Sequence, residues 1–488
     1  MKDYTQLDQP HWAKFSPAVS SAYSRSSTVK GRKPRVPAEP QIVPARDLDF
    51  LSPDTTLVRL NIVLASAGQF AKTAPAAKAS DMLTIARPGV VRIADSGGFQ
   101  LGANTMPYEG PPTMERILLW QERFDLAMTM DFPLASVAKG AISTHIAALE
   151  GPLKDIVRPV LNGVHVTAAD LQLMNGQSEA FNVCLTFTLF NNQWYVENRT
   201  PGATDILNVI QGTGLVESRV WCDAVKDFPF EGFALAGQGH LHNAEMSLTR
   251  IIQLRDEGKL DTRRWLHFLG TSEPANLCFY STVQQCLTND LGSFTVSADA
   301  SSAFTRAVYG QVSVGFTLGR GRWVTKITDI NALDLVGSDE AFLDYCERRW
   351  RQDCFNADFI EGRGLDATGR LIDGDPRFFV QTEIGKRLRV GDVCVKRALN
   401  DKGKPKTWGT HTLAYMMNHN LQINQEYLIT ALTAYDEENR TLVPSQLIEL
   451  KQVVPEIFRS ERPMDTIYKH RRLLNLLALL SDMRSGYR

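Results

Sequence analysis

Four polar side chains of this sequence each come directly after a short apolar run, and together they could perform acid–base or nucleophilic chemistry. They are Asp95, Asp131, Gln211 and Asp299. A carboxylate can move a proton or attack an electrophilic carbon, and carboxylates beside an amide can bind the polar edge of a flat ligand. Short apolar runs of this kind are typical of buried strands, and the carboxyl ends of parallel strands meet on one face. We therefore expect one site built from strand ends.

The first of these ends lies in the stretch Val91-Arg-Ile-Ala-Asp-Ser-Gly-Gly-Phe-Gln100. Its two glycines remove side-chain bulk, so a flat ligand could lie against the backbone. Phe99 could cover one face of that ligand, and Asp95 and Gln100 could bond its edge. Taken by itself, the stretch fits equally well a Gly-Gly turn in which Asp95 caps a helix. The residues at the other strand ends are therefore needed to choose between a ligand site and a capped turn.

The elements that would position these residues alternate between strand and helix. Strands are expected at 57–64, 90–94, 126–130, 156–161, 206–210, 232–236, 265–269 and 294–298, with helices at 114–124, 215–226, 241–256 and 274–287. This alternation predicts an α/β fold with a parallel sheet covered by helices. Eight such units predict a TIM (β/α)8-type barrel, whose chemistry sits at the carboxyl ends of the strands. A doubly wound open sheet is the alternative, but no Gly-x-Gly-x-x-Gly follows the first strand.

The pattern divides the chain into three regions. Residues 1–48 are rich in Ser, Pro and charge and predict an N-terminal arm. A solvated arm or one that covers a sheet edge is favoured over one that contacts phosphates through Lys30-Gly-Arg-Lys-Pro-Arg35. Residues 49–335 are assigned to the barrel, with an insertion at about 170–204 that contains a β-rich, aromatic segment. Residues 336–488 are mixed and then helical, and the last helix has a wide apolar face that suits its own protein or a second subunit.

The bulk composition narrows the class of protein. The 488 residues are 43% hydrophobic and 22% charged, as in ordinary soluble globular proteins. The net charge of −1 predicts weak unaided binding to a polyanion. Seven scattered cysteines with no Cys-x-x-Cys predict reduced, buried thiols. No apolar run approaches the ~18 residues of a membrane span and no signal-peptide core is seen, so we expect a cytoplasmic protein without a membrane partner.

The motifs at the strand ends resemble those of the tRNA-guanine transglycosylase superfamily. Five segments match in family order: Ile93-Ala-Asp-Ser-Gly-Gly-Phe-Gln100, Asp125-Leu-Ala-Met-Thr-Met-Asp131, Leu207-Asn-Val-Ile-Gln-Gly212, Phe230-Glu-Gly-Phe-Ala-Leu-Ala-Gly237 and Phe268-Leu-Gly270. The resemblance implies a TIM barrel and base exchange by double displacement. A carboxylate attacks C1′ of a nucleotide, guanine leaves, and a 7-deazaguanine takes its place with retention.

The resemblance also implies roles for single residues. Asp95 would be the acid and base, and it would hold the amino edge of the purine together with Asp131. Gln211 and a backbone N–H near Gly237 would bond the carbonyl edge, while Phe99 would stack on the base. The base would leave its stack to reach this site. Further positions expected to contact it come from the same motifs: Ser96, Gly97, Gly212 and Leu269.

The nucleophile is matched less directly. The family has a Phe-Asp pair at the end of a late strand, and this chain has Ser297-Ala-Asp there. We therefore expect Asp299 to attack C1′, with Asp290 as its competitor and a helix cap as the structural alternative for Asp299. His240 and His242 stand where the family usually has Gly-Glu, which puts that Glu contact in doubt.

The zinc module of the family is degenerate in this chain. The family carries Cys-x-Cys-x-x-Cys and a distant His, which form a tetrahedral zinc site. Here the matching positions are Asp392, Cys394, Arg397 and His419. We expect no metal and no cofactor, with an Asp392–Arg397 ion pair in place of the zinc and Cys346 or Cys354 as the rescuing ligands if a metal does bind.

After the nucleophile the bacterial tRNA enzymes have a Pro-Thr-Arg-Ser-Gly-Arg-like run, and this chain has Ala300-Ser-Ser-Ala-Phe-Thr-Arg306 instead. It also lacks an evident archaeal-type RNA-binding tail and is longer than the bacterial tRNA enzymes. These departures are similar to the DNA-modifying branch, the DpdA-type proteins that insert 7-cyano-7-deazaguanine or related bases into DNA. DNA is thus the expected partner, with a tRNA transglycosylase or a non-catalytic nucleic-acid-binding subunit as alternatives. Arg306, Arg320 and Arg322, with Lys326 and Trp323, are expected to contact the nucleic-acid backbone, although a solvated face explains them equally well. Because unaided binding is expected to be weak, we expect a partner such as a helper ATPase. The apolar face of the last helix also allows a homo-oligomer.

Overall fold

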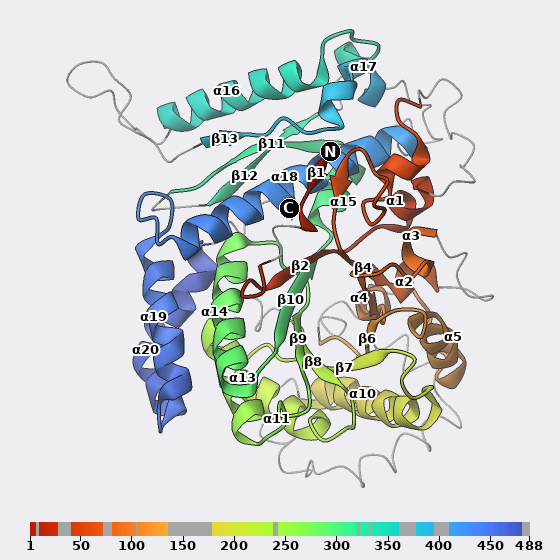
Figure 1. Cartoon of the computed structure of the whole chain (residues 1–488). Helices are drawn as coiled ribbons and strands as arrows, with labels where there is room; N and C mark the ends of the chain where they lie inside the picture. The colour runs from red at the N-terminus through yellow and green to blue at the C-terminus, as the bar shows by residue number, and fades with distance from the viewer. Residues whose placement is uncertain are drawn as a thin grey trace.

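Eight parallel strands form the main sheet of the protein (Figure 1). The structure is a computed structural model that describes residues 1–5, 9–27, 41–71, 81–103, 105–134, 178–237, 243–319, 323–330, 333–360, 377–394 and 409–480. The strand order is β2-β10-β9-β8-β7-β6-β5-β4. A parallel bridge between Ala18 and Leu64 joins the two outer strands, so the sheet curls into a barrel. The predicted TIM-barrel-like α/β fold is confirmed.

The barrel strands are short, and most of them are followed by a helix on the outside. The strands are β2 (Lys14–Pro17), β4 (Ile62–Ser66), β5 (Val91–Asp95), β6 (Leu126–Met128), β7 (Asp205–Ile210), β8 (Gly232–Leu235), β9 (Trp265–Phe268) and β10 (Thr295–Ala300). The helices are α2 (Ala67–Phe70), α4 (Gly98–Gly102), α5 (Pro111–Gln121), α10 (Ser178–Asn198), α11 (Leu215–Val225), α13 (Ala244–Asp256), α14 (Pro274–Leu291) and α15 (Ser302–Val308).

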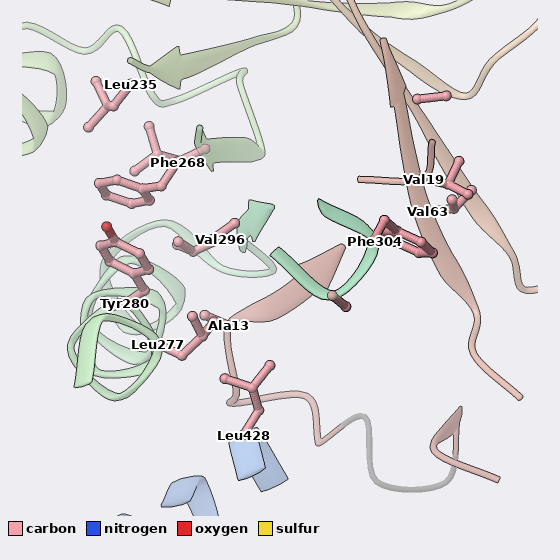
Figure 2. Close-up of a cluster of buried hydrophobic side chains, with 14 of the residues drawn as sticks. Ala13, Val19, Val63, Leu235, Phe268, Leu277, Tyr280, Val296, Phe304 and Leu428 are labelled. Carbon is pink, nitrogen blue, oxygen red and sulfur yellow. The ribbon is translucent and has the colours of Figure 1, made fainter. Parts of the chain in front are cut away.

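Alternate residues of each strand face the helices or the barrel axis. In β10, Val296 and Ala298 join the large core between sheet and helices, so Ser297 and Asp299 face inward. Figure 2 shows part of that outer core, where Phe268 of β9 stacks on Tyr280 of α14 with ring centroids 3.7 Å apart. A second, smaller core fills the barrel itself, with members such as Ile93, Val209 and Ala234.

The N-terminal segment takes part in the barrel. Residues 14–17, which the sequence pattern places in the arm, form β2 between β10 and β4, and Asp299 is in register with Ser16. The segment has few apolar residues, so its strand conformation comes from pairing with both neighbouring strands rather than from local preference. The expected strand at 156–161 lies outside the described residues, and β6 pairs directly with β7.

The aromatic segment expected to be β-rich is instead a helix. α10 covers residues 178–198 and packs against α5 and α11, in the usual place of a barrel helix. Phe181, Leu185 and Leu189 are buried at a spacing of four residues, which is the period of a helix face. The β-branched and aromatic content misled the prediction because burial against two helices outweighs intrinsic preference.

The remaining elements form a second layer beside the barrel. An antiparallel sheet of β11 (Gln311–Thr317), β12 (Val324–Asp329) and β13 (Arg377–Phe379) packs between α16 (Phe342–Ile360) and α18 (Thr410–Asp436) (Figure 1). The hairpin of α19 (Ser445–Arg459) and α20 (Pro463–Leu480) packs on α13 and α14. The other short elements are β1 (Lys2–Asp3), β3 (Val58–Arg59), α1 (Ser21–Ser26), α3 (Asp81–Thr84) and α17 (Val390–Val393).

No helix among the described residues is long and apolar enough to cross a membrane. The six cysteines whose side chains the structure describes are buried and form no disulfide with one another.

Candidate active site

The four polar residues that follow apolar runs lie at the carboxyl ends of four barrel strands. Asp95 ends β5, Asp131 follows β6, Gln211 follows β7, and Asp299 is the second-last residue of β10. The carboxyl group of Asp95 interacts electrostatically with those of Asp131 and Asp299. Because all the strands are parallel, the fold brings these side chains to one rim of the barrel, as the sequence predicts.

Asp131 and Gln211 form a buried pair. The Gln211 amide Nε2 donates a hydrogen bond to Asp131 Oδ2, and the two residues are only 5% and 4% exposed. Burial raises the pKa of Asp131 from its ordinary 3.8 to about 7, against the Gln211 hydrogen bond, and the charge of Asp95 adds to the rise. Asp131 can therefore gain or lose a proton near neutral pH.

Two glycines let the backbone approach this pair closely. A Cβ on Gly98 would lie 3.0 Å from Asp131 Oδ1, and one on Gly237 would lie 3.1 Å from Gln211 Oε1. Gly237 also has a φ of +89°, a left-handed conformation that favours glycine. Close packing therefore favours glycine at both positions, and the backbone conformation favours it at Gly237 as well.

Asp95 lies beside hydrogen-bond donors that favour its ionised form. Partial burial raises its pKa and the nearby Asp299 raises it further, while hydrogen bonds from Ser66 and the Gly97 N–H act in the opposite direction. The Gly97 N–H lies 3.2 Å from Asp95 Oδ2. A carboxyl group balanced in this way suits proton transfer to and from a bound base.

Asp299 is held from two directions through one oxygen. Its Oδ1 accepts a hydrogen bond from the Gly270 N–H at 3.0 Å and lies 3.1 Å from His267 Nε2. The competitor Asp290 is far less suited, because it lies near the end of α14 on the outside of the barrel. There it pairs with Arg255 at 3.2 Å and its side chain is 36% exposed. Of the two aspartates, only Asp299 lies at the rim.

The other expected base contacts also lie at strand ends on this rim. Ser96 is fully buried, and its hydroxyl has no hydrogen-bond partner among the described residues. Phe99 is the second residue of α4 and is 70% exposed, so its ring is accessible to a ligand. Three further residues that are expected to contact the base follow β5, β7 and β9, respectively: Gly97, Gly212 and Leu269.

Two of the expected nucleic-acid contacts, Arg306 and Trp323, have hydrogen-bond partners within the protein. Arg306 on α15 donates to Ser313 Oγ at 3.2 Å, and burial lowers the pKa of its guanidinium. Trp323 is 1% exposed and donates its Nε1–H to the Leu442 carbonyl, so the prediction that it contacts nucleic acid was wrong. Arg320 and Arg322 lie outside the described residues.

The residues at the degenerate zinc positions have other partners. His419 is buried between Thr382 Oγ1 and the Ser313 carbonyl, each 2.7 Å from a ring nitrogen, and burial lowers its pKa to about 4. Cys394 donates to the Ile330 carbonyl. The Asp392 carboxylate accepts from the Arg389 N–H at the start of α17. Within the described residues no three His, Cys, Asp or Glu side chains are placed to hold a metal. The expected loss of zinc stays a prediction, and Arg397, His240 and His242 lie outside the described residues.

Sequence reasoning missed two residues that touch the rim. His267 lies within an apolar run, which predicts a residue of the hydrophobic core, yet it contacts Asp299. Ser66 ends β4 in register with Asp95. The signal that could have found His267 is the two-residue period of a strand, because Ser297 and Asp299 share one face of β10 and His267 is in register with Ser297.

No protein-family model matches the chain, and no curated protein matches it. The functional argument therefore depends on the geometry of the rim.

Proposed function

We propose that this protein is a guanine transglycosylase that replaces guanine in DNA with a 7-deazaguanine such as 7-cyano-7-deazaguanine. The observation that carries the proposal is the meeting of three aspartates in different environments at one rim. Asp299 is anchored through Oδ1, whereas the pKa values of Asp131 and Asp95 are raised. Groups with such different environments can take different roles in one reaction.

The first half-reaction breaks the bond to guanine. Asp299 attacks C1′ of the target nucleotide, the C1′–N9 bond breaks, and the bonding electrons leave with guanine. Asp95 in its protonated form gives that base a proton. The product is a covalent ester between Asp299 and the sugar, with inverted configuration at C1′.

The second half-reaction reverses these steps with a new base. Asp95, now ionised, takes the proton from N9 of the entering 7-deazaguanine, and N9 attacks C1′. The bond to Asp299 breaks and the free carboxylate is restored. Two inversions retain the configuration at C1′, and the proton count closes because Asp95 returns to its starting state.

The buried pair would read the purine edge. An ionised Asp131 can accept from the N–H groups of a guanine-like base, and the second N–H of the Gln211 amide can donate to its carbonyl oxygen. The exposed Phe99 ring can cover the base. The choice of DNA over tRNA rests on the departures from the tRNA enzymes in the sequence that follows Asp299.

An exchange assay tests this proposal. Radiolabelled guanine or 7-cyano-7-deazaguanine is incubated with the full chain and with single-stranded DNA, duplex DNA or tRNA. Label is expected in DNA, and a protein–DNA adduct that survives denaturing electrophoresis is expected during turnover. Asp299→Asn should abolish both signals, while the matched surface variant Asp290→Asn should keep them.

Other outcomes would correct the proposal in defined ways. Label that enters only tRNA would replace the DNA assignment with a tRNA transglycosylase. An active Asp299→Asn with an inactive Asp290→Asn would show that the wrong nucleophile is named. No label in any polymer would refute the enzyme and favour a non-catalytic subunit.

A further inference from the structure

A chain of hydrogen-bonded side chains leads from the interior of the barrel to Asp299. Trp265 Nε1 lies 2.7 Å from Ser297 Oγ, which lies 2.7 Å from His267 Nδ1. His267 Nε2 in turn lies 3.1 Å from Asp299 Oδ1. The pairing of β9 with β10 sets His267 opposite Ser297. Two neighbouring strands thus supply a continuous polar path that ends on the proposed nucleophile.

The location of this path is unusual for a barrel interior. His267 and Ser297 are fully buried, whereas the next residues in the same row of strand register, Ala234 and Val209, are apolar. Buried polar groups contribute to stability only when all their hydrogen bonds are made, and apolar side chains of similar size fill such space at lower cost. Packing alone therefore does not require polar residues at these two positions.

With Asp299 as a carboxylate, which can only accept, and His267 as a neutral imidazole, the chemistry of the groups fixes the direction of each hydrogen bond. An indole N–H can only donate, so Ser297 Oγ accepts from Trp265. The hydroxyl hydrogen of Ser297 then donates to Nδ1 of His267. A neutral imidazole that accepts at Nδ1 carries its hydrogen on Nε2. That N–H faces Asp299 Oδ1, so every group in the path has a partner.

We propose that His267 is a positioning residue for Asp299 in the transglycosylase reaction, with Ser297 and Trp265 fixing its tautomer. This inference rests on the proposed function. The His267 Nε2–H and the Gly270 N–H both bind Oδ1, which stops the carboxylate from rotating. Oδ2 accepts no hydrogen bond from the described residues and is the atom that attacks C1′.

The expected effect is on rate rather than on binding of the base. His267 contacts the nucleophile and not the purine-reading pair, so its loss should lower kcat and leave KM for the base nearly unchanged. Outer-shell partners that orient metal-binding side chains are worth about 10- to 100-fold, and we expect a loss of similar size for a partner that orients a nucleophile. A misplaced nucleophile should also form the covalent adduct more slowly by the same factor.

Three variants and a control separate positioning from packing. His267→Phe fills the space without an N–H and should lose about 10- to 100-fold in kcat. His267→Gln offers an N–H at similar reach and should recover most of that loss. The kcat of Ser297→Ala should lie between those of His267→Phe and His267→Gln. His419→Phe removes the other described buried imidazole with two partners and should lower thermal stability without changing kcat of the folded fraction.

A spectroscopic readout tests the same idea without turnover. In protein labelled with ¹⁵N-histidine, the His267 resonances, identified by their absence in His267→Gln, should report hydrogen on Nε2. Ser297→Ala should reduce that preference. Hydrogen on Nδ1 in the wild type would overturn the positioning role.

The positioning role of His267 and the transglycosylase function would be refuted by different experimental results. An active wild type whose kcat is unchanged by His267→Phe would overturn the role of His267 and leave the transglycosylase intact. A wild type that exchanges no base with any polymer would overturn the proposed function, and the positioning role with it.

Discussion

Replacement of Asp131 by Asn should stabilise the protein at alkaline pH. Burial raises the pKa of Asp131 to about 7 from the 3.8 of an unfolded chain. Between these values the folded state holds a proton that the unfolded state releases, so this group's contribution to stability is lost as the pH rises from about 4 to about 7. The difference of about 3 pKa units, at about 1.36 kcal/mol each, amounts to about 4 kcal/mol.

Asparagine at position 131 avoids this loss of stability, because its side chain has nearly the same shape as that of aspartate but cannot ionise. Its side chain stays neutral at every pH, and its carbonyl oxygen can still accept the Gln211 hydrogen bond. Asp131→Asn should exceed the wild type in free energy of unfolding by about 4 kcal/mol at pH 8 and by about 2 kcal/mol at pH 5. The same variant should lose exchange activity, because an amide N–H replaces an acceptor of the base. A gain of stability with a loss of activity is typical of residues kept for function.

Urea unfolding followed by tryptophan fluorescence at pH 5 and pH 8 measures these differences. The control is Asp290→Asn, where the carboxylate is on the surface beside Arg255 and should give no gain that grows with pH. A gain for Asp131→Asn that is equal at the two pH values would show that the carboxyl group is not held in the way the structure indicates. A variant less stable than the wild type at pH 8 would refute the reasoning outright.

Two further predictions concern the pair formed by Asp131 and Gln211. Guanine affinity, measured by isothermal titration calorimetry, should rise about tenfold per pH unit from pH 5 to 7 and level off above pH 8. The reason is that the N–H donors of guanine require an ionised Asp131 as their acceptor. An affinity that does not change with pH would contradict this. Gly98→Ala should weaken guanine binding about tenfold, as its Cβ would lie 3.0 Å from Asp131 Oδ1 and shift it by a few tenths of an ångström. Gly214→Ala, whose Cβ meets nothing within 4 Å, is the matched control, and equal affinities would sink the claim.

The strand–helix alternation was readable because each buried strand is a short apolar run. That pattern predicts the barrel and the residues at its carboxyl rim without further information. β2 could not be read this way, because Lys14-Phe-Ser-Pro has a single large apolar residue and becomes a strand by pairing on both sides. In α10 the local preference pointed to a strand, and burial against neighbouring helices decided otherwise.

The site was predicted as a set of residues but not as a set of contacts. That Asp131 bonds Gln211, or that His267 supports Asp299, depends on which strands are neighbours and on their register. Trp323 shows the opposite error, because nearby positive charges suggested a surface and its ring is instead buried with its N–H on the Leu442 carbonyl. Sequence spacing indicates which face a side chain takes within one strand, and the fold decides what it meets.

The closing strand has a consequence for the life of the nascent chain. Ser16 is in register with Asp299, so β2 cannot pair with β10 until the ribosome has added a further 283 residues. At ribosomal speeds of about 5–20 residues per second, the interval is on the order of 15 to 60 s. Until then the early strands have an unpaired edge, and Asp299 is not yet in place. Asp299 therefore belongs to the last barrel strand to be synthesised, and a product truncated before it can neither pair β2 with β10 nor supply this carboxylate.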